Sequence, residues 1–350
     1  AFKAVKDVDH PILLHINTLK GKGYEPAIDN EEAHHWVMPF DLKTDKTTVP
    51  APEGPTANSV AMDVMKKHIE NGEKIMAIDA AIPGVFGLDE IKNKYPENYH
   101  DVGIAEQESV AFAAGMAKEG AVPVLFENST FLQRAFDQLS HDVAANDLPV
   151  VMMVAGGGMS GTSKTHLGIF DQVMISNLPN WIYLAPTTLA EEKDMMEWAI
   201  KQRKHPVAIK MPTKRVPAGK DVSRDYSEIK YDIKPGNDVA VLALGDMYEM
   251  LGKEVAEKLG ASLVNPISAN ILDTASLDKL ADENKVIVTL EDNILDGGFG
   301  EKVASYLGDK DVKVLNYGQK RVYTDQVPLK DILKDNRMTV DQIVEDVKNA

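Results

Sequence analysis

The stretch DVGIAEQ, residues 101–107, places the carboxylate of Glu106 between a strand-like and a helix-like segment. Val102 and Ile104 are typical of the end of a short strand, and the residues that follow, ESVAFAAGMA, are mostly small and favour a helix. A carboxylate at such a junction lies at the mouth of an α/β sheet, where catalytic groups are often held. The simpler interpretation, which stays open at this point, is that Glu106 only interacts with the dipole of its helix.

Short apolar runs on either side of this stretch predict the fold. Between residues 75 and 212 they are IMAID, VPVLFEN, LPVVMMVAGG, WIYLAP and PVAIKMP, and helical patterns separate most of them. This alternation indicates βαβ units and a parallel sheet covered on both faces. Thr56 is expected to cap the first helix. A second series, DVAVLALGD, ASLVNP, KVIVTLED and VKVLNYG, follows from residue 238. The sequence therefore predicts the α/β class, with two parallel or mixed-sheet domains at 55–216 and 225–350.

The first 54 residues have a different character. They contain an apolar run that predicts a short strand, PILLHIN at 11–17, and then a glycine-rich turn and the polar segment EEAHHW. The stretch TTVPAPEGPTAN, which begins at Thr47, is typical of a linker. We expect that residues 1–54 cannot build a core alone, and that they are the tail of a preceding domain together with its linker.

Composition excludes several classes of function. With 54 acidic and 38 basic residues, the formal net charge of the 350-residue chain is −16, which argues against binding to nucleic acid or to anionic membrane surfaces. The sequence has no cysteine, which excludes disulfides and thiolate metal sites. No apolar run approaches the ~20 residues of a membrane helix, and the start shows no signal-peptide pattern, so we expect a cytoplasmic protein.

Two further segments carry a more detailed prediction. Residues 131–145 predict a helix with an apolar stripe and a second, polar stripe that is typical of a solvated surface. The apolar stripe is Leu132, Ala135, Phe136, Leu139 and Val143, and the polar stripe is Arg134, Asp137, Gln138 and His141. In the second domain, Glu291, Asp292 and Asn293 are expected to form a polar turn that ends a buried strand, rather than to contact the neighbouring domain.

Three motifs occur in the same order as in a known enzyme family. They are YPENYHDVGIAEQESVAFAAGMAKEG at 95–120, STFLQRAFDQLSHDVA at 129–144 and KTHLGIFD at 164–171. The likeness extends from LKGKGYEPA at 19–27, through AAIPG at 80–84, to VTLEDN at 288–293, and so covers nearly the whole chain. On these motifs the sequence resembles the 1-deoxy-D-xylulose-5-phosphate synthases, which belong to the thiamine-diphosphate-dependent, transketolase-like superfamily.

The resemblance implies a two-carbon transfer. In this family, thiamine diphosphate takes a two-carbon unit from pyruvate with loss of CO₂, and the unit passes to glyceraldehyde 3-phosphate. Glu106 would be the carboxylate that hydrogen-bonds the pyrimidine ring of the cofactor and exchanges a proton with it. Its carboxyl must then be able to hold a proton. The apolar side chains nearby in the sequence are expected to favour that form by excluding water. They are Val102, Ile104, Val110 and Phe112.

The same resemblance implies the other residues of the site. His166 in KTHLGIFD would move protons at the substrate, His35 in AHHWVMPFD would contact the substrate, and Phe131 would form a wall beside the pyrimidine ring. The implied catalytic residues are Glu106, His166 and His35, and the implied cofactor-binding residues are Glu106, Ile104, Asn128, Phe131 and Arg134. From the residues alone, a single histidine in a glycine-rich loop, such as His166, is more often structural, and Phe131 fits an ordinary core residue equally well. Likewise His35 alone fits an exposed loop histidine.

The sequence departs from the family pattern at positions linked to the acceptor substrate. An Asp-Arg pair of the family is replaced by Ala155 and Gly156, and the family's YPRG motif appears as MPTK at 211–214. Asn128 stands where the family usually has an aromatic residue. Both missing arginines belong to the family's recognition of a phosphorylated acceptor, and lysine does not reproduce their bidentate geometry. Partial compensation is expected from Lys164, Lys210, Lys214 and Arg215. We therefore expect a relaxed or different acceptor, either another sugar phosphate or an unphosphorylated aldehyde.

The resemblance also implies a metal ion and a partner chain. Enzymes of this superfamily hold the diphosphate through a divalent cation, with a GDG motif and an asparagine about thirty residues further on. This sequence has no such unit, so we expect the Mg²⁺ ligands in an N-terminal domain before residue 1, and none in this chain. The chain alone is then expected to be inactive. A homodimer that acts on small molecules, namely pyruvate and an aldehyde or sugar phosphate, is expected, rather than a protein that binds nucleic acid or a membrane.

Two alternative functions remain open. The first is another enzyme of the superfamily, either the second subunit of a split transketolase or the β subunit of a 2-oxo acid dehydrogenase, because these share the carboxylate and the order of the domains. The second is a non-catalytic paralogue that acts as a regulatory or scaffold subunit. The lost arginines favour that interpretation, whereas the retained Glu106, Phe131, Arg134 and His166 argue against it.

Overall fold

The computed structural model describes residues 1–35, 37–50, 53–213 and 216–350, and it separates into two units at residue 54. Unit 1 holds helices α1 (Phe2–Val5) and α2 (Glu25–Asp29) and a small antiparallel pair, β1 (Phe40–Asp41) and β2 (Lys46–Thr47). Among its described residues only Ala27 is buried, which confirms that this unit builds no core alone. The predicted strand at 11–17 is wrong, because the segment has no partner strand and forms no regular structure.

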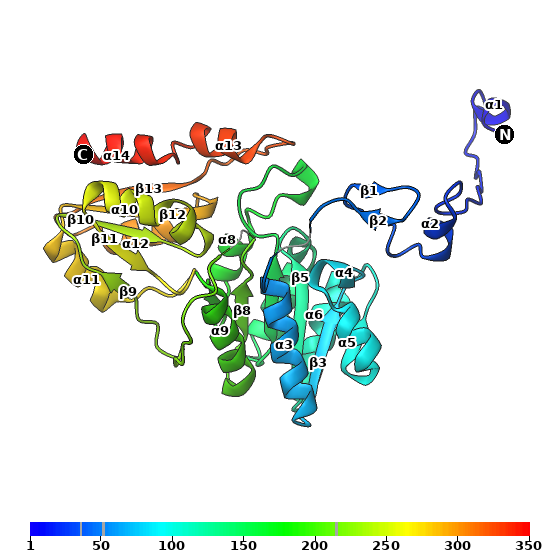
Figure 1. Ribbon diagram of the computed structural model, residues 1–350, viewed down its shortest axis with the longest axis horizontal. Coiled ribbons are helices and arrows are strands. Elements are labelled where there is room, and N and C mark those ends of the chain that lie inside the picture. Colours follow the sequence, from blue (N-terminus) through cyan, green and yellow to red (C-terminus); the bar gives the residue numbers. More distant parts are fainter. Residues whose placement is uncertain (36, 51–52, 214–215) are drawn as a thin grey trace. The chain divides into compact units, whose positions relative to one another are not determined.

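The first part of unit 2 builds a six-stranded sheet from described residues, and all its neighbouring strands run parallel. The strand order is β4-β3-β5-β6-β8-β7, and Figure 1 labels its strands β3, β5 and β8. Five of the strands lie within the predicted apolar runs, so the parallel α/β prediction is confirmed. The strands are β3 (Ile75–Asp79), β4 (Tyr99–Asp101), β5 (Val122–Asn128), β6 (Val151–Ala155), β7 (Ile182–Leu184) and β8 (Val207–Lys210).

Helix α3 (Ala57–Glu70) begins where the sequence predicts. The side chain of Thr56 accepts a hydrogen bond from Ser59 N at 3.2 Å, and Ser59 Oγ accepts one from Thr56 N at 2.8 Å. These two backbone N–H groups, which lack a partner within the helix, are therefore both hydrogen-bonded. Its buried face packs against the sheet and against α9 (Leu189–Gln202). Helix α6 (Glu106–Lys118) packs against β3 and β5. The other elements are α4 (Pro83–Phe86), α5 (Asp89–Lys94), η1 (Pro96–Asn98), η4 (Lys164–His166) and α8 (Asp171–Ser176).

Residues 131–144 differ from the single helix that the sequence predicts. They form a 3₁₀ turn, η2 (Phe131–Ala135), then α7 (Phe136–Gln138), and then a π-helical turn, η3 (Leu139–Ala144). The predicted apolar residues are buried except Phe136, which is 41% exposed. Since 3₁₀, α and π turns advance by different angles per residue, a stripe drawn at one helical period cannot hold along the whole segment.

The second part of unit 2 builds a mixed five-stranded sheet from described residues, in the order β13-β12-β10-β11-β9. Strand β9 (Asp232–Lys234) runs antiparallel to β11 and the other pairs are parallel. The parallel strands are β10 (Val239–Ala243), β11 (Ser262–Asn265), β12 (Val286–Ile294) and β13 (Lys313–Gln319), and the helices are η5 (Tyr248–Gly252), α10 (Lys253–Leu259), α11 (Thr274–Glu283), α12 (Phe299–Tyr306), α13 (Leu329–Asp335) and α14 (Val340–Lys348). None of the helices in the described ranges is long and apolar enough to cross a membrane.

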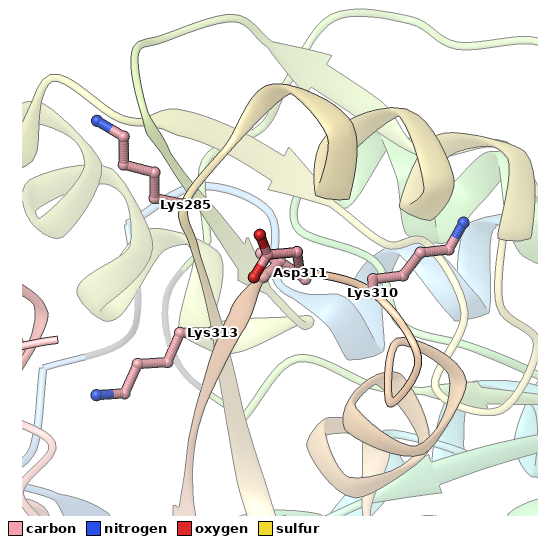
Figure 2. A pocket seen from close by; sticks show the side chains of 5 residues that line it. Lys285, Lys310, Asp311 and Lys313 are labelled. Carbon is pink, nitrogen blue, oxygen red and sulfur yellow. The ribbon is translucent and has the colours of Figure 1, made fainter.

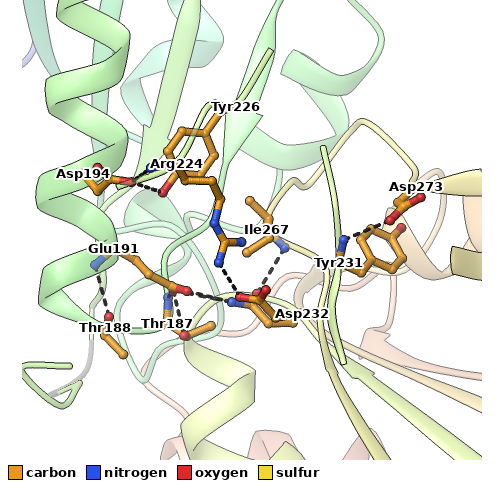
Figure 3. Close-up of polar contacts among 11 residues, drawn as sticks. Thr187, Thr188, Glu191, Asp194, Arg224, Tyr226, Tyr231, Asp232, Ile267 and Asp273 are labelled. Atoms are coloured by element: carbon orange, nitrogen blue, oxygen red, sulfur yellow. Dashed lines mark hydrogen bonds and ion pairs between the residues drawn. The ribbon is translucent and has the colours of Figure 1, made fainter. Parts of the chain in front are cut away.

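Backbone pairing joins the two sheets within unit 2. The outer edge of β7 pairs with the segment 267–269, since Ala185 N donates to Ile267 O at 2.8 Å and Ala269 N donates to Tyr183 O at 2.8 Å. Figure 3 shows the polar contacts beside this junction. There Asn265 Nδ2 donates to Glu191 Oε1 at 3.1 Å. These contacts hold the start of α9 against the second sheet.

The chain segment that connects the two sheets is held by further hydrogen bonds. Asp194 on α9 accepts from Arg224 N at 3.0 Å and from Tyr226 OH at 2.8 Å (Figure 3). The guanidinium of Arg224 in turn donates to Asp232 Oδ2 at 2.8 Å. The connection is therefore fixed to both parts rather than left as a free linker.

Candidate active site

The candidate site lies at the carboxyl edge of the parallel sheet. Strands β3, β4 and β5 end there at Asp79, Asp101 and Asn128, and Glu106 begins α6 five residues after β4 ends. The strand that the sequence places up to Ile104 ends at Asp101, and Val102 and Ile104 lie in the turn before α6. In a parallel sheet the residues at these ends share one edge, so a helix that starts there presents its first side chain to the edge.

Glu106 is buried and has one charged neighbour. It is 3% exposed, and Arg134 Nη1 on η2 lies 2.9 Å from its Oε2. The geometry is that of an ion pair without an aligned hydrogen bond, since Oε2 has no hydrogen-bond partner. The guanidinium side chain is 52% exposed, so the pair reaches from the interior to the surface. Oε2 of Glu106 can therefore still accept a hydrogen bond from a ligand.

The apolar surroundings predicted for Glu106 are present in part. Val110 is buried, and Val102 and Phe112 are half-buried. Ile104 is 77% exposed and so does not exclude water from Glu106 in this chain. The predicted contact of Ile104 with a cofactor stays a prediction.

Two more carboxyl groups, at the ends of β3 and β5, are buried. Glu127 on β5 is fully buried, its Oε1 accepts from Asn128 N at 2.8 Å, and its Oε2 has no partner. Burial, together with the carboxylates of Glu106 and Asp79, raises the pKa of Glu127 to about 8. Burial and the carboxylate of Asp101 raise the pKa of Asp79 to about 7. The sequence analysis missed both groups, although an acidic residue inside an apolar strand run is a signal that could have found them.

His166 and Phe131 lie together on the loop side of the site. Their rings meet edge to face with centroids 5.7 Å apart. The imidazole is exposed, and its Nδ1 lies 3.0 Å from Thr165 Oγ1 and 3.3 Å from Ser163 Oγ. Since Phe131 and Arg134 share the short turn η2, the aromatic pair and the Glu106 ion pair are neighbours along the chain.

The other predicted site residues have different positions. Asn128 ends β5, and its Oδ1 accepts from Thr130 N at 3.1 Å, so it shapes the turn into η2. His35 lies in unit 1, where Lys20 Nζ is 2.8 Å from its Nδ1. The structure does not place His35 relative to Glu106, and its contact with a substrate stays a prediction.

The expected role of Lys210 is wrong. The Lys210 side chain at the end of β8 is 3% exposed, and its Nζ lies 3.2 Å from Asp292 Oδ1 and 3.9 Å from Asp171 Oδ2. Burial lowers the pKa of Lys210, but these carboxylates outweigh burial and raise that pKa above its usual value. The ammonium is therefore committed to an ion pair and cannot replace a phosphate-binding arginine. Lys214 and Arg215 lie outside the described residues.

The prediction of a polar turn at 291–293 is also wrong. These residues belong to strand β12, are buried, and contact the first domain. Glu291 Oε2 accepts from Gln172 Nε2 at 2.8 Å, and Asn293 Nδ2 donates to Asp171 Oδ1 at 2.9 Å. Hydrogen bonds across the domain junction offset part of the cost of burying these polar side chains in a strand.

A separate surface hollow does not form a ligand site. It has a volume of about 430 Å³ beside β12 and β13 and is lined by three lysines, Asp311 and Val312 (Figure 2). Lys310 lies 3.0 Å from Asp278, Lys285 lies 3.6 Å from Asp238, and Lys313 Nζ donates to Ala350 O at 3.4 Å. Figure 2 shows the three ammonium groups pointing away from one another. Among the described residues, no group of three or more His, Cys, Asp or Glu side chains is arranged to hold a metal ion.

Comparison with known proteins identifies the two domains. Residues 54–218 match the family described as "Transketolase, pyrimidine binding domain", and residues 228–343 match "Transketolase, C-terminal domain". A solved structure titled "Split gene transketolase, inactive beta4 tetramer" has a TM-score of 0.73 at 24% identity, and the match covers 85% of this chain and 98% of that chain. At this identity the likeness supports the fold alone.

Curated relatives agree with the family resemblance of the sequence. Among them are 1-deoxy-D-xylulose-5-phosphate synthases of Clostridium acetobutylicum, 36% identical over 90% of this chain, and of Methylacidiphilum infernorum, 38% identical over 87%. The matches cover 52% and 49% of those proteins, so the chain spans about half the length of the curated relatives that it matches. The predicted resemblance is thereby confirmed. The chain belongs to the transketolase family, in which it carries a pyrimidine-binding domain followed by a C-terminal domain.

Proposed function

We propose that this chain supplies the pyrimidine-binding part of a thiamine-diphosphate enzyme, and that Glu106 holds the pyrimidine ring. The observation that carries this proposal is the buried Oε2 of Glu106, which has no hydrogen-bond partner. This oxygen is ion-paired with Arg134 but accepts no aligned hydrogen bond, and a protonated ring nitrogen is a donor of fitting chemistry.

The residues of this chain would bind and orient the cofactor and the substrate, and would exchange protons with them. Bound thiamine diphosphate supplies the electron sink that permits the carboxyl group of a 2-keto acid to leave. Glu106 exchanges a proton at the ring nitrogen, and Arg134 balances the charge of its carboxylate. Phe131 supplies the aromatic wall, and the exposed imidazole of His166 beside it moves a proton at an oxygen of the substrate. Asn128, Ile104 and His35 are assigned to cofactor and substrate contacts in the same proposal.

We propose pyruvate as the donor and an aldehyde as the acceptor, by similarity to the synthases named above. Recognition of the acceptor is proposed to be altered, because Ala155 and Gly156 carry no charge and Lys210 is locked in an ion pair. Steady-state kinetics with phosphorylated and unphosphorylated aldehydes test this part. A strong preference for glyceraldehyde 3-phosphate over all other acceptors would contradict it.

The proposal includes a metal ion and a partner chain. Mg²⁺ is assigned to ligands outside this chain, in a part of the enzyme that binds the diphosphate. A homodimer is proposed because Ile104, next to Glu106, is 77% exposed and Phe136, on the neighbouring turn, is 41% exposed. Apolar side chains at the rim of a site fit a surface that another subunit covers. The enzyme is proposed to act on small molecules in the cytoplasm.

Replacement of Glu106 by Gln tests the proposed function. In the complete protein that contains this chain, E106Q should lower thiamine-dependent decarboxylation of pyruvate by at least about 10²-fold, because Gln cannot take up the proton. Glu108→Gln is the matched control, since Glu108 is an exposed carboxylate on the first turn of the same helix. Equal activity of E106Q and E108Q would favour the non-catalytic interpretation.

A second candidate is a two-chain transketolase-type enzyme. The sequence leaves this candidate open, because such subunits share the carboxylate and the order of the domains, and a solved structure of the same fold is titled a split-gene transketolase. The choice of donor distinguishes the candidates. Turnover of a ketose phosphate without release of CO₂ would support the second candidate, and release of CO₂ from pyruvate would support the first.

A further inference from the structure

The loop at 156–168 carries His166 and is closed at its base. It follows β6, and Gly158 N donates to Gly168 O at 2.6 Å, so the chain leaves and returns at one point. A Cβ atom at Gly168 would lie 1.9 Å from Gly156 O, which no side chain tolerates. The base of the loop is thus fixed by the first domain, while the position of its tip depends on other contacts.

Met159 anchors this loop in the core of the C-terminal domain. The side chain is 4% exposed and belongs to an apolar cluster whose other buried members in the described chain all come from residues 241–347. They include Val241, Met247 and Leu290. Gly158 beside it packs so tightly on Asp292 that a Cβ there would lie 2.0 Å from Oδ2. A methionine of the first domain is therefore part of the second hydrophobic core.

A short segment of the C-terminal domain, residues 323–327, lies along the same loop. We call it the clamp segment. Gln326 N donates to Thr162 O at 2.9 Å, and Lys164 N donates to Asp325 Oδ1 at 3.2 Å. The space beside Gly161 is filled by the carbonyl of Val327, which a Cβ would meet at 3.1 Å. Contacts of the clamp segment therefore lie on both sides of His166, at Lys164 and at Phe170, whose ring centroid is 5.9 Å from that of Tyr323.

We propose that the C-terminal domain positions His166, with Met159 and Asp325 as the positioning residues. This rests on the role proposed for His166 above. The imidazole is exposed and contacts only Phe131 and hydroxyl groups of its own loop among the described residues, so its orientation follows the backbone of the loop. That backbone is held on one side by Met159 and on the other by the clamp segment. The C-terminal domain thereby affects the chemistry without touching a substrate.

The positioning role of Met159 is tested by Met159→Ala in this chain. Hydrogen exchange of backbone amides 162–167 should accelerate at least about tenfold, and the His166 ring resonances in an NMR spectrum should shift and broaden. Met247→Ala is the matched control, since it removes the same atoms from the same core at a position outside the loop. Met159→Leu, of similar volume, should restore both signals. Unchanged exchange in M159A, or equal acceleration in M247A, would overturn the proposal.

The clamp segment is tested at an exposed residue, where unfolding is not a concern. Asp325→Ala should accelerate exchange at Lys164 and change the His166 signals, while Asp325→Asn, which keeps an acceptor oxygen, should not. Asp331→Ala is the control, because it removes an exposed carboxylate from α13 nearby. Wild-type signals in D325A would contradict the proposed role of Asp325.

The two proposals can fail separately. In the complete protein, M159A should lower kcat/KM for the aldehyde at least about tenfold while binding of thiamine diphosphate stays within about twofold of wild type. The exchange measurements report on positioning without cofactor or substrate, and E106Q reports on the enzyme function. If exchange is altered in M159A and D325A while E106Q keeps full activity, the proposed function is contradicted and the positioning of His166 by the C-terminal domain is still supported.

Discussion

Glu127 is a carboxyl group that the fold holds away from water near the end of β5. One oxygen accepts from the backbone, and the other has no partner. Its pKa is raised from 4.5 to about 8 in the folded protein, so folding takes up a proton over that range. The contribution of this group to stability is complete below pH 4.5 and is lost as the pH rises through about 8.

We predict that Glu127→Gln stabilises the protein at high pH. At pH 9 the wild type must bury a carboxylate, whereas the amide stays neutral, so the free energy of unfolding should favour the variant by on the order of a few kcal/mol. At pH 5 the two should unfold at nearly the same temperature. Melting curves at both pH values measure this, with E108Q as an exposed control. An equal difference at pH 5 and pH 9 would show that Glu127 is not buried as a carboxylate.

Single residues were predictable where they belong to a motif shared with a known family. Glu106 was found from its motif, and the structure shows it buried at the start of a helix. Asp79 and Glu127 were missed, although each belongs to an apolar strand run, where an acidic residue is the signal of a buried carboxyl group. Lys210 was misjudged because its partners, Asp171 and Asp292, lie 39 and 82 residues away in the sequence.

The strands β8 and β12 meet through a buried ion pair. Lys210 ends β8, and Asp292 lies within β12. Buried pairs of this kind add little net stability, because desolvation offsets the attraction, but removal of one partner leaves an uncompensated charge. The pair therefore specifies how the two sheets dock.

We predict that Lys210→Met destabilises the protein by about 3–5 kcal/mol. The variant leaves the buried carboxylates of Asp171 and Asp292 without their cation. Adding Asp292→Asn should recover part of the loss, so the two substitutions should not be additive. Chemical denaturation of the single and double variants measures the coupling. Lys285→Met, at an 81% exposed surface side chain, is the control and should change little. Additive losses in the double variant would mean that the two side chains do not interact.

Elements were predictable where their periodicity is uniform. The apolar runs gave five strands of the first sheet, and Thr56 marked the start of α3. The segment 131–144 could not be predicted, because its mixture of 3₁₀, α and π turns is imposed by packing against α6 rather than by local propensity. Strand β4 was too short, at three residues, to show a period of its own.

At the scale of the whole molecule, the first 54 residues differ from the rest in burial. We predict that limited proteolysis cuts this segment first, at lysines such as Lys22 and Lys43, which lie in exposed turns. A fragment that begins near residue 55 should persist, with a melting temperature within about 2 °C of the intact chain, because the described residues of the removed part contribute one buried side chain. Mass spectrometry of the digest identifies the fragment. Early cleavage inside 75–210 would contradict this prediction.

The exposed apolar side chains near Glu106, namely Ile104 and Phe136, predict where a second subunit binds. Ile104→Asp and Phe136→Asp should each weaken a homodimer at least about tenfold, because a charge would be buried at the interface. Sedimentation velocity over a range of concentrations measures the change. Val322→Asp, at a 54% exposed position of the C-terminal domain, is the control. Dimers that tolerate both rim substitutions would place the interface elsewhere.

The short backbone pairing between β7 and residues 267–269 has a consequence for biosynthesis. A ribosome completes every strand of the first sheet roughly sixty residues before it reaches Ile267. During that interval the β7 edge lacks the backbone that later covers it, and an uncovered edge is a template for strand exchange between nascent chains. A polypeptide truncated before residue 267 should therefore be recovered mainly as aggregates, and slower translation of that interval should increase the demand for chaperones.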